Sequence, residues 1–269
     1  MLTIIIPTIG RANSFLRSLR SACVIDRSVV KQIIVIDNSQ SRNITELDLN
    51  SSFDDRIHLV TYKERKPMGE SWNGAIRHVS QPWLLYLHDD DELIADNINT
   101  LSPILLSNSE ASFIAFDYFD RSLKKTVLKS RSHPKSMNST NSIIRNPPKF
   151  VSTIISLKAL KSIGSWDDSY GYFLDLVGFI EMTKVTPPAF IPQTIGVHTV
   201  GALGQASAVH KRATGYGDYI PITINKLFPM FNDSERGTLL ESLSIFVYPP
   251  TSLSFRCRIF RLLKAIKRF

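Results

Sequence analysis

Two short runs of the chain, residues 4–6 and 33–36, consist of isoleucine and valine with no polar residue among them. A strand with one face in solvent alternates apolar and polar side chains, so an unbroken apolar run predicts a strand that is covered on both faces. Strands of this kind are typical of parallel sheets, because each crossover connection places a helix on a face of the sheet. The two runs therefore predict an α/β fold.

The rest of the chain extends this pattern. Strands are predicted at residues 2–6, 32–36, 57–62, 83–87 and 112–116, and they alternate with a helix that Asn13 caps and a helix at residues 70–79. The second half is predicted to be more helical, with helices at residues 158–163, 173–185, 216–231 and 234–246. We expect a central, mostly parallel sheet flanked by helices, with a more helical C-terminal extension.

Size and composition restrict the classes of protein. The 269 residues, 43% of them hydrophobic, can form one main domain, which we expect at residues 1–210 with a segment 211–269 appended. Cys23 and Cys257 are too few and too distant for a disulfide framework or a close-spaced zinc motif, which favours a reducing compartment. The net charge of +8 suits an anionic partner, which could be nucleic acid, a phosphorylated ligand or a membrane surface.

The acidic run Asp89, Asp90 and Asp91 directly follows the predicted strand at residues 83–87. Adjacent carboxylates repel each other unless a cation binds them, and their hard oxygen atoms suit Mg²⁺ or Mn²⁺. A solvated turn or a helix N-cap is the structural alternative. The place of the run at a strand end, where other polar loops also converge, favours the cation site.

Two further loops are expected at the same edge of the sheet. Asp37 ends the second predicted strand and either binds a nucleobase or ribose or forms an Asx-turn. The first strand ends in Pro7 and Thr8, after which Gly10 permits close backbone approach and Arg11 can pair with a phosphate. Because ligands gather at the carboxyl ends of parallel strands, these loops predict one shared binding site.

Four segments, in this order and at these spacings, resemble a known family: residues 5–8 with Arg11, residues 35–39, residues 69–76 and residues 87–91. They are similar to the nucleotide-sugar glycosyltransferases of GT-A fold, in particular the family 2 group, over about residues 2–200. The resemblance implies a GT-A (Rossmann-like) catalytic domain at residues 1–210, with a nucleotide-binding half 1–120 and an acceptor half 121–210.

For the donor, the resemblance implies a UDP-, dTDP- or GDP-sugar and a bound Mn²⁺ or Mg²⁺. Asp91 would be the main metal ligand, with Asp89 and His198 as further ligands, while a structural role remains the alternative for His198. Asn73 either lies near the nucleotide or has a structural role, in which its side chain caps or crosslinks parts of the fold. The residues implied to bind the nucleotide sugar are Pro7, Thr8, Arg11, Asp37, Asn73, Asp89 and Asp90.

For the acceptor, the resemblance implies direct displacement with inversion, in which a carboxylate removes the proton of the attacking hydroxyl. Asp175, at the start of a predicted helix, is the candidate base; alternatively it only favours the helix dipole. The segment lacks a Glu before Asp175, and Glu181 and Met182 stand where an arginine is expected. The acceptor is expected to be a glycan or lipid-linked glycan of bacterial polysaccharide, O-antigen or capsule assembly, with a weak likeness to rhamnosyltransferases.

The last segment, residues 254–269, has six basic residues and, at helical spacing, an apolar face that includes Phe255, Ile259 and Leu262. Such a helix either lies on an anionic membrane or docks on its own domain. If this helix lies on the membrane, we expect a cytoplasmic protein that is bound peripherally to the inner face of the cell membrane.

Two other classes of function would fit parts of this sequence. A nucleotidyltransferase or a metal-dependent phosphohydrolase could use the same acidic strand ends, but the chain has no glycine-rich P-loop. A nucleic-acid-binding module is disfavoured because the basic residues are dispersed and the acidic run would repel phosphate without a metal ion. No nucleic-acid partner is expected.

Overall fold

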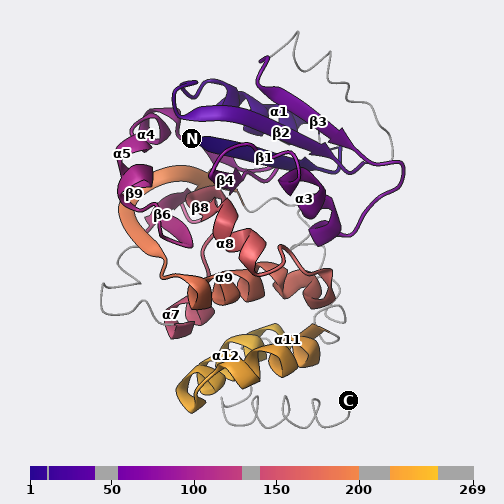
Figure 1. Cartoon of the computed structure of the whole chain (residues 1–269), viewed down its shortest axis with the longest axis vertical. Coiled ribbons are helices and arrows are strands. Elements are labelled where there is room, and N and C mark those ends of the chain that lie inside the picture. Colours follow the sequence, from indigo (N-terminus) through magenta and orange to yellow (C-terminus); the bar gives the residue numbers. More distant parts are fainter. Residues whose placement is uncertain (11, 40–53, 129–139, 200–218, 248–269) are drawn as a thin grey trace.

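The computed structural model of the chain describes residues 1–10, 12–39, 54–128, 140–199 and 219–247. Within these ranges a nine-stranded sheet runs in the order β3-β2-β1-β4-β8-β6-β9-β5, with β7 paired to β6. Figure 1 shows the sheet between helices, with the last described helices, α11 and α12, forming a layer beside α9. The predicted α/β fold is confirmed.

The first half agrees closely with the sequence. Strand β1 (Leu2–Thr8) pairs in parallel with β2 (Val30–Asp37) and with β4 (Trp83–Tyr86), and β2 pairs in parallel with β3 (Ile57–Thr61). The connecting helices are α1 (Ala12–Cys23) and α3 (Met68–Ile76). Asn13 lies inside α1, so the prediction that it caps this helix is wrong by at least two positions.

The predicted strand at residues 112–116 is β6 (Phe113–Asp120), and the chain contributes more strands than expected. The additional strands are β7 (Lys125–Val127), β8 (Thr153–Ser156), β9 (Ala189–His198) and the short β5 (Glu92–Leu93), which pairs with β9. Strand β8 is antiparallel to both β4 and β6, whereas β6 and β9 are parallel. The sheet is thus parallel from β3 to β4 and mixed beyond.

The remaining helices and 3₁₀ turns all follow β5 in the chain. They are α4 (Ala95–Asn99), α5 (Ser102–Ser107), α7 (Thr140–Arg145), α8 (Leu157–Ser162), α9 (Leu174–Val185), α11 (Tyr219–Leu227) and α12 (Asp233–Val247), with short 3₁₀ turns η1 (Phe150–Ser152), η2 (Asp168–Phe173) and η3 (Phe228–Met230). No helix in the described ranges is long and apolar enough to cross a bilayer.

The apolar side chains form two core clusters, and the central strands contribute to both. Ile5 and Ile34 belong to one cluster, whereas Ile4, Ile6 and Ile33 belong to the other. Successive residues of a strand point to opposite faces, so this division shows that both faces are covered, as the unbroken apolar runs predict. Helices α11 and α12 join the first cluster through the buried side chains of Ile220, Ile224, Leu227, Leu239 and Leu243. The domain boundary at residue 210 stays a prediction.

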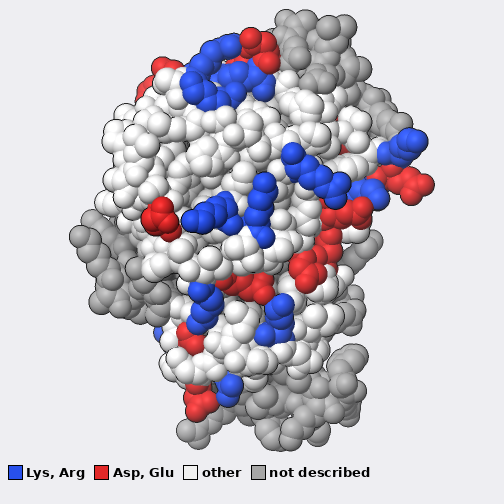
Figure 2. Space-filling model, in the orientation of Figure 1, with Lys and Arg blue, Asp and Glu red and all other residues white. Residues whose placement is uncertain are grey.

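The net charge of +8 is not collected into one patch on the face that Figure 2 shows, where Lys and Arg side chains alternate with Asp and Glu side chains. Arg56 and Asp54 form a buried ion pair. The Arg56 guanidinium donates to both Asp54 oxygens and to the carbonyls of Cys23, Ile25 and Val30, and only 7% of its side chain is exposed. It therefore ties the end of α1 to the start of β3.

Replacing Arg56 with methionine is expected to cost about 3–5 kcal/mol of unfolding free energy, because it takes a buried guanidinium away from the Asp54 carboxylate and from three backbone carbonyls. Burial raises the pKa of Asp54, but the hydrogen bonds and charge of Arg56 outweigh this and leave it below the usual value. Urea denaturation measures the loss. Arg27 pairs with the same Asp54 but is 60% exposed, so Arg27→Met should cost less than about 1 kcal/mol. Equal losses would contradict this account.

Candidate active site

The loops that follow β1, β2 and β4 meet at one edge of the sheet. The Thr8 hydroxyl donates to Asp89 Oδ2 at 2.8 Å, and the Asn38 amide donates to the Thr8 carbonyl at 2.9 Å. Gly10, at φ 92°, turns its amide back to the Thr8 hydroxyl at 3.1 Å. The predicted residues Thr8, Asp37 and Asp89 are therefore brought together, whereas Arg11 lies outside the described residues.

Asp37 is 1% exposed, and its two oxygens have different surroundings. Oδ1 accepts the Ser39 amide at 2.9 Å, which is the Asx-turn that the sequence allows. Oδ2 is buried and has no hydrogen-bond partner in the described part of the chain. An unpaired buried oxygen costs about 1–3 kcal/mol, so this atom is suited to accept a hydrogen bond from a ligand.

Asn73 links α3 to the segment before η2. Its side-chain amide donates to the Trp166 carbonyl at 2.7 Å, and its carbonyl oxygen accepts the Trp166 amide at 2.9 Å. Both ends of the side chain are thus used within the protein, as the structural alternative for this residue predicts. A contact of Asn73 with the nucleotide stays a prediction.

Asn73→Ala is expected to cost about 2 kcal/mol of unfolding free energy, because two hydrogen bonds to the Trp166 backbone are lost together. The measurement is a urea titration followed by circular dichroism. Arg77→Ala, at the exposed end of the same helix, is the control and should change stability by less than about 0.5 kcal/mol. A loss no larger than that of the control would rule out the link as a stabilising element.

Asp168 makes a second link between the two halves of the site. Its oxygens accept the Gly69 and Glu70 amides, each at 2.6 Å, at the first turn of α3. A Cβ atom at Gly69 would lie 2.9 Å from the Asp168 carboxyl carbon, which explains the glycine here. No local pattern predicts this contact, because 99 positions separate Gly69 from Asp168. The segment that leads to Asp175 is thus attached to the first turn of α3.

Asp91 is 2% exposed and strongly constrained. Its Oδ1 accepts the Thr199 amide at 2.8 Å and lies 3.1 Å from His198 Nδ1, and its carbonyl accepts the Ser18 hydroxyl. The predicted pair of Asp91 and His198 is therefore in contact at the end of β9. Asp89, 5% exposed, points instead to Thr8.

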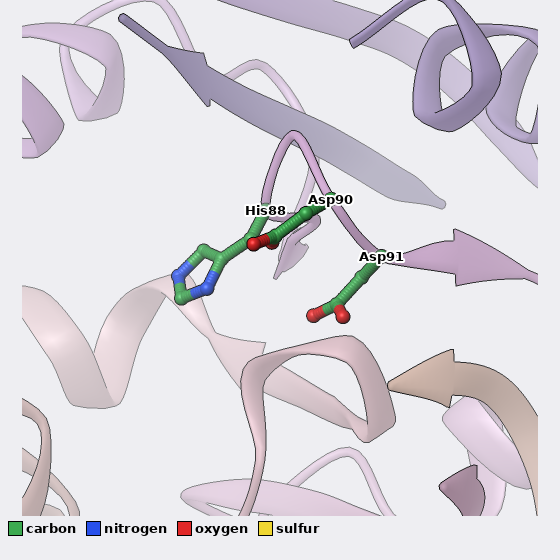
Figure 3. Close-up of side chains that lie close together, drawn as sticks. All are labelled: His88, Asp90 and Asp91. Carbon is green, nitrogen blue, oxygen red and sulfur yellow. The ribbon is translucent and has the colours of Figure 1, made fainter. Parts of the chain in front are cut away.

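Three side chains around the acidic run offer metal-ligand atoms close together. One ring nitrogen of His88 and one carboxylate oxygen each of Asp90 and Asp91 lie within 4.8 Å of one another. Figure 3 shows the three side chains on the same side of the loop after β4. Two carboxylates and an imidazole fit a hard or borderline divalent cation such as Mn²⁺. His88 was not among the predicted ligands, although it directly precedes the acidic run.

Asp175 lies in the first turn of α9, and its Oδ1 accepts the Leu176 amide at 2.7 Å. Burial raises the pKa of Asp175 above its ordinary value, while the Leu176 amide and the charges of Lys149 and His88 act against this. A carboxylate with a raised pKa holds a proton more strongly and is a better general base.

Comparison with known proteins agrees with this geometry. Residues 3–157 match the model of the glycosyl transferase family 2, and the match covers more than half of the chain. The chain therefore belongs to the family 2 glycosyltransferases and is an enzyme. No curated protein matches the sequence significantly.

Solved structures are similar in fold. The structure of S. aureus TarS 1-349 in complex with UDP-GlcNAc has a TM-score of 0.70 at 12% identity, covering 98% of this chain and 80% of that one. The mannosyltransferase PcManGT from Pyrobaculum calidifontis, in complex with GDP-Man and Mn²⁺, has a TM-score of 0.59 at 13% identity, covering 99% and 86%. These TM-scores establish the GT-A fold, whereas identities of 12% and 13% say nothing about the donor or acceptor of this chain.

Proposed function

We propose that this glycosyltransferase is metal-dependent and inverting, and that it moves a sugar from a nucleoside-diphosphate donor to a hydroxyl of a glycan or lipid-linked glycan. One observation carries the proposal. The loops after β1, β2 and β4 meet through the Thr8–Asp89 hydrogen bond, beside an Asp37 oxygen that is buried and unpaired in the described part of the chain. The edge thus offers acceptor atoms for a nucleoside next to a group of metal-ligand atoms.

On the donor side, Asp37 Oδ2 would accept a hydrogen bond from the base or ribose, and Pro7, Thr8 and Arg11 would border the nucleoside. Asp89 would lie near the ribose, where the Thr8 hydroxyl orients it. The similar structures hold UDP-GlcNAc and GDP-Man, which supports a nucleotide-sugar donor without selecting its base.

The metal ion would be held by Asp91 and Asp90, with Asp89, His88 and His198 as the remaining candidate ligands. When bound, such an ion neutralises the charge that develops on a departing diphosphate. Asp91 is suited to this place because the Thr199 amide and His198 orient its carboxylate before any ligand arrives.

On the acceptor side, Asp175 would accept the proton of the attacking hydroxyl through the oxygen that the Leu176 amide does not use. Direct attack opposite the leaving group inverts the anomeric centre, so one base is sufficient. The role of the whole chain in bacterial polysaccharide assembly is part of the same proposal. The basic segment 254–269, proposed to bind the inner membrane face, lies outside the described residues.

The test is to incubate the protein with Mn²⁺ and a panel of UDP-, dTDP- and GDP-sugars and to identify the released nucleotide. Slow release of nucleoside diphosphate from one donor is expected, through transfer to water, and a glycan acceptor should accelerate it. Release of pyrophosphate or nucleoside monophosphate would instead support the nucleotidyltransferase or phosphohydrolase alternative.

A further inference from the structure

His88 occupies an unusual environment for a histidine. Its ring packs against Trp72, with centroids 5.8 Å apart, and against Phe150, with centroids 5.4 Å apart. Nε2 is buried and has no hydrogen-bond partner in the described ranges of the chain. Buried polar side chains are nearly always hydrogen-bonded, so a purely structural role would favour an apolar residue here.

The same ring also approaches two carboxylates of the loop that follows β4. A nitrogen of His88 lies within 4.8 Å of oxygens of Asp90 and Asp91, a spacing at which one cation can be shared. Figure 3 shows the imidazole beside the Asp90 carboxylate, with Asp91 further along the same loop. The two aromatic neighbours restrict the ring to this orientation, which lowers the entropy lost on binding an ion.

An imidazole changes which ion a carboxylate site prefers. Mg²⁺ favours oxygen ligands at short distances and gives up its water reluctantly. First-row transition ions accept imidazole nitrogen readily, and Mn²⁺ among them also accepts carboxylates. Exchanging one oxygen ligand for a nitrogen ligand should therefore weaken Mg²⁺ binding more than Mn²⁺ binding.

We propose that His88 is a metal ligand and determines the ion specificity of this site, making it selective for Mn²⁺ over Mg²⁺. This inference rests on the proposed function, since it places the ion at the same strand end. It adds the identity of the ion and the residue that selects it. The donor set is one imidazole with the carboxylates of Asp90 and Asp91.

The test is direct ion binding without a sugar donor. Mn²⁺ binding is measured by the electron paramagnetic resonance signal of the free ion, and Mg²⁺ binding by competition. Wild type should bind Mn²⁺ at least about tenfold more tightly than Mg²⁺. His88→Phe, which keeps the ring packing on Trp72 and Phe150, should weaken Mn²⁺ binding by about tenfold or more. His88→Asp should shift the preference toward Mg²⁺.

Two controls make the outcome decisive. His78→Ala removes an exposed imidazole from the end of α3 and should leave ion binding unchanged. The melting temperature of each variant shows whether it is folded; if His88→Phe does not fold, His88→Gln replaces it with the same expectation. Unchanged Mn²⁺ affinity and an unchanged Mn²⁺ to Mg²⁺ ratio in the folded His88 variants would overturn the proposal. Absence of nucleoside-diphosphate release from every donor would instead count against the proposed function, because ion selectivity is measured without a donor.

Discussion

Asp91→Asn is expected to lower kcat/KM about a thousandfold, because the variant loses the negative charge that would hold the metal ion beside the leaving diphosphate. A bound ion contributes several kcal/mol of charge stabilisation, and about 4 kcal/mol corresponds to a thousandfold change in rate. Asparagine is chosen over alanine because its oxygen can still accept the Thr199 amide. The structure around Asp91 should therefore survive the change. The measurement is the rate of nucleoside-diphosphate release at saturating Mn²⁺.

The matched control is Asp96→Asn, which removes an exposed carboxylate from the first turn of α4, five positions along the chain. It should leave the rate within about twofold of wild type. If Asp91→Asn also stayed within a few-fold of wild type while remaining folded, the metal role of the acidic run would have to be abandoned.

Asp175→Asn is expected to lower kcat with the natural acceptor by about 10²–10⁴, the usual contribution of a general base, with little change in the KM of the donor. Asp167→Asn is the control, since Asp167 is exposed and lies eight positions earlier in the same segment. Near-normal turnover of Asp175→Asn, with loss in Asp167→Asn, would move the base to Asp167. Asp168 is a weaker candidate because two backbone amides already occupy its oxygens.

The same substitution has an expected effect on stability. The folded protein raises the pKa of Asp175, chiefly through burial, above its value in the unfolded chain. A group of this kind stabilises the fold fully below the unfolded pKa and loses that contribution as the pH rises through the folded pKa. At pH 7 the ionised side chain therefore disfavours folding, and Asp175→Asn should be at least as stable as wild type. Melting temperatures at pH 4 and pH 7 should show the variant gaining on wild type at the higher pH.

The first half of the fold could be predicted from the sequence because its signals are local. The runs at residues 4–6 and 33–36 are apolar throughout, and the strands they predict, β1 and β2, are interior strands with a neighbour on each side. Strand β9 was missed because Pro192 interrupts it and its register with β6 shifts near Asp117. Most of its residues are only partly buried, so no regular alternation reveals it.

Part of the candidate site could also be predicted, because its signals are local in the sequence. Thr8 and Asp37 end β1 and β2, and Asp89 follows the end of β4. The rule that ligands bind at the carboxyl ends of parallel strands places the three residues together. The place of His88 among the metal-ligand atoms and the link from Asp168 to α3 were not predicted, because both depend on partners that are distant in the sequence. For His88 these are Trp72 and Phe150, and for Asp168 the start of α3.

The aromatic cluster beneath His88 gives the protein a built-in optical reporter. Of the three tryptophans, Trp72 and Trp166 lie edge to face with centroids 5.8 Å apart, and Trp72 also touches His88. The third, Trp83, lies at the other end of β4 in the second core cluster. Paramagnetic Mn²⁺ quenches nearby indole fluorescence and diamagnetic Mg²⁺ does not. Emission from Trp72 and Trp166 would thus follow occupancy of the site without a label, with Trp83 as an internal reference within the same molecule.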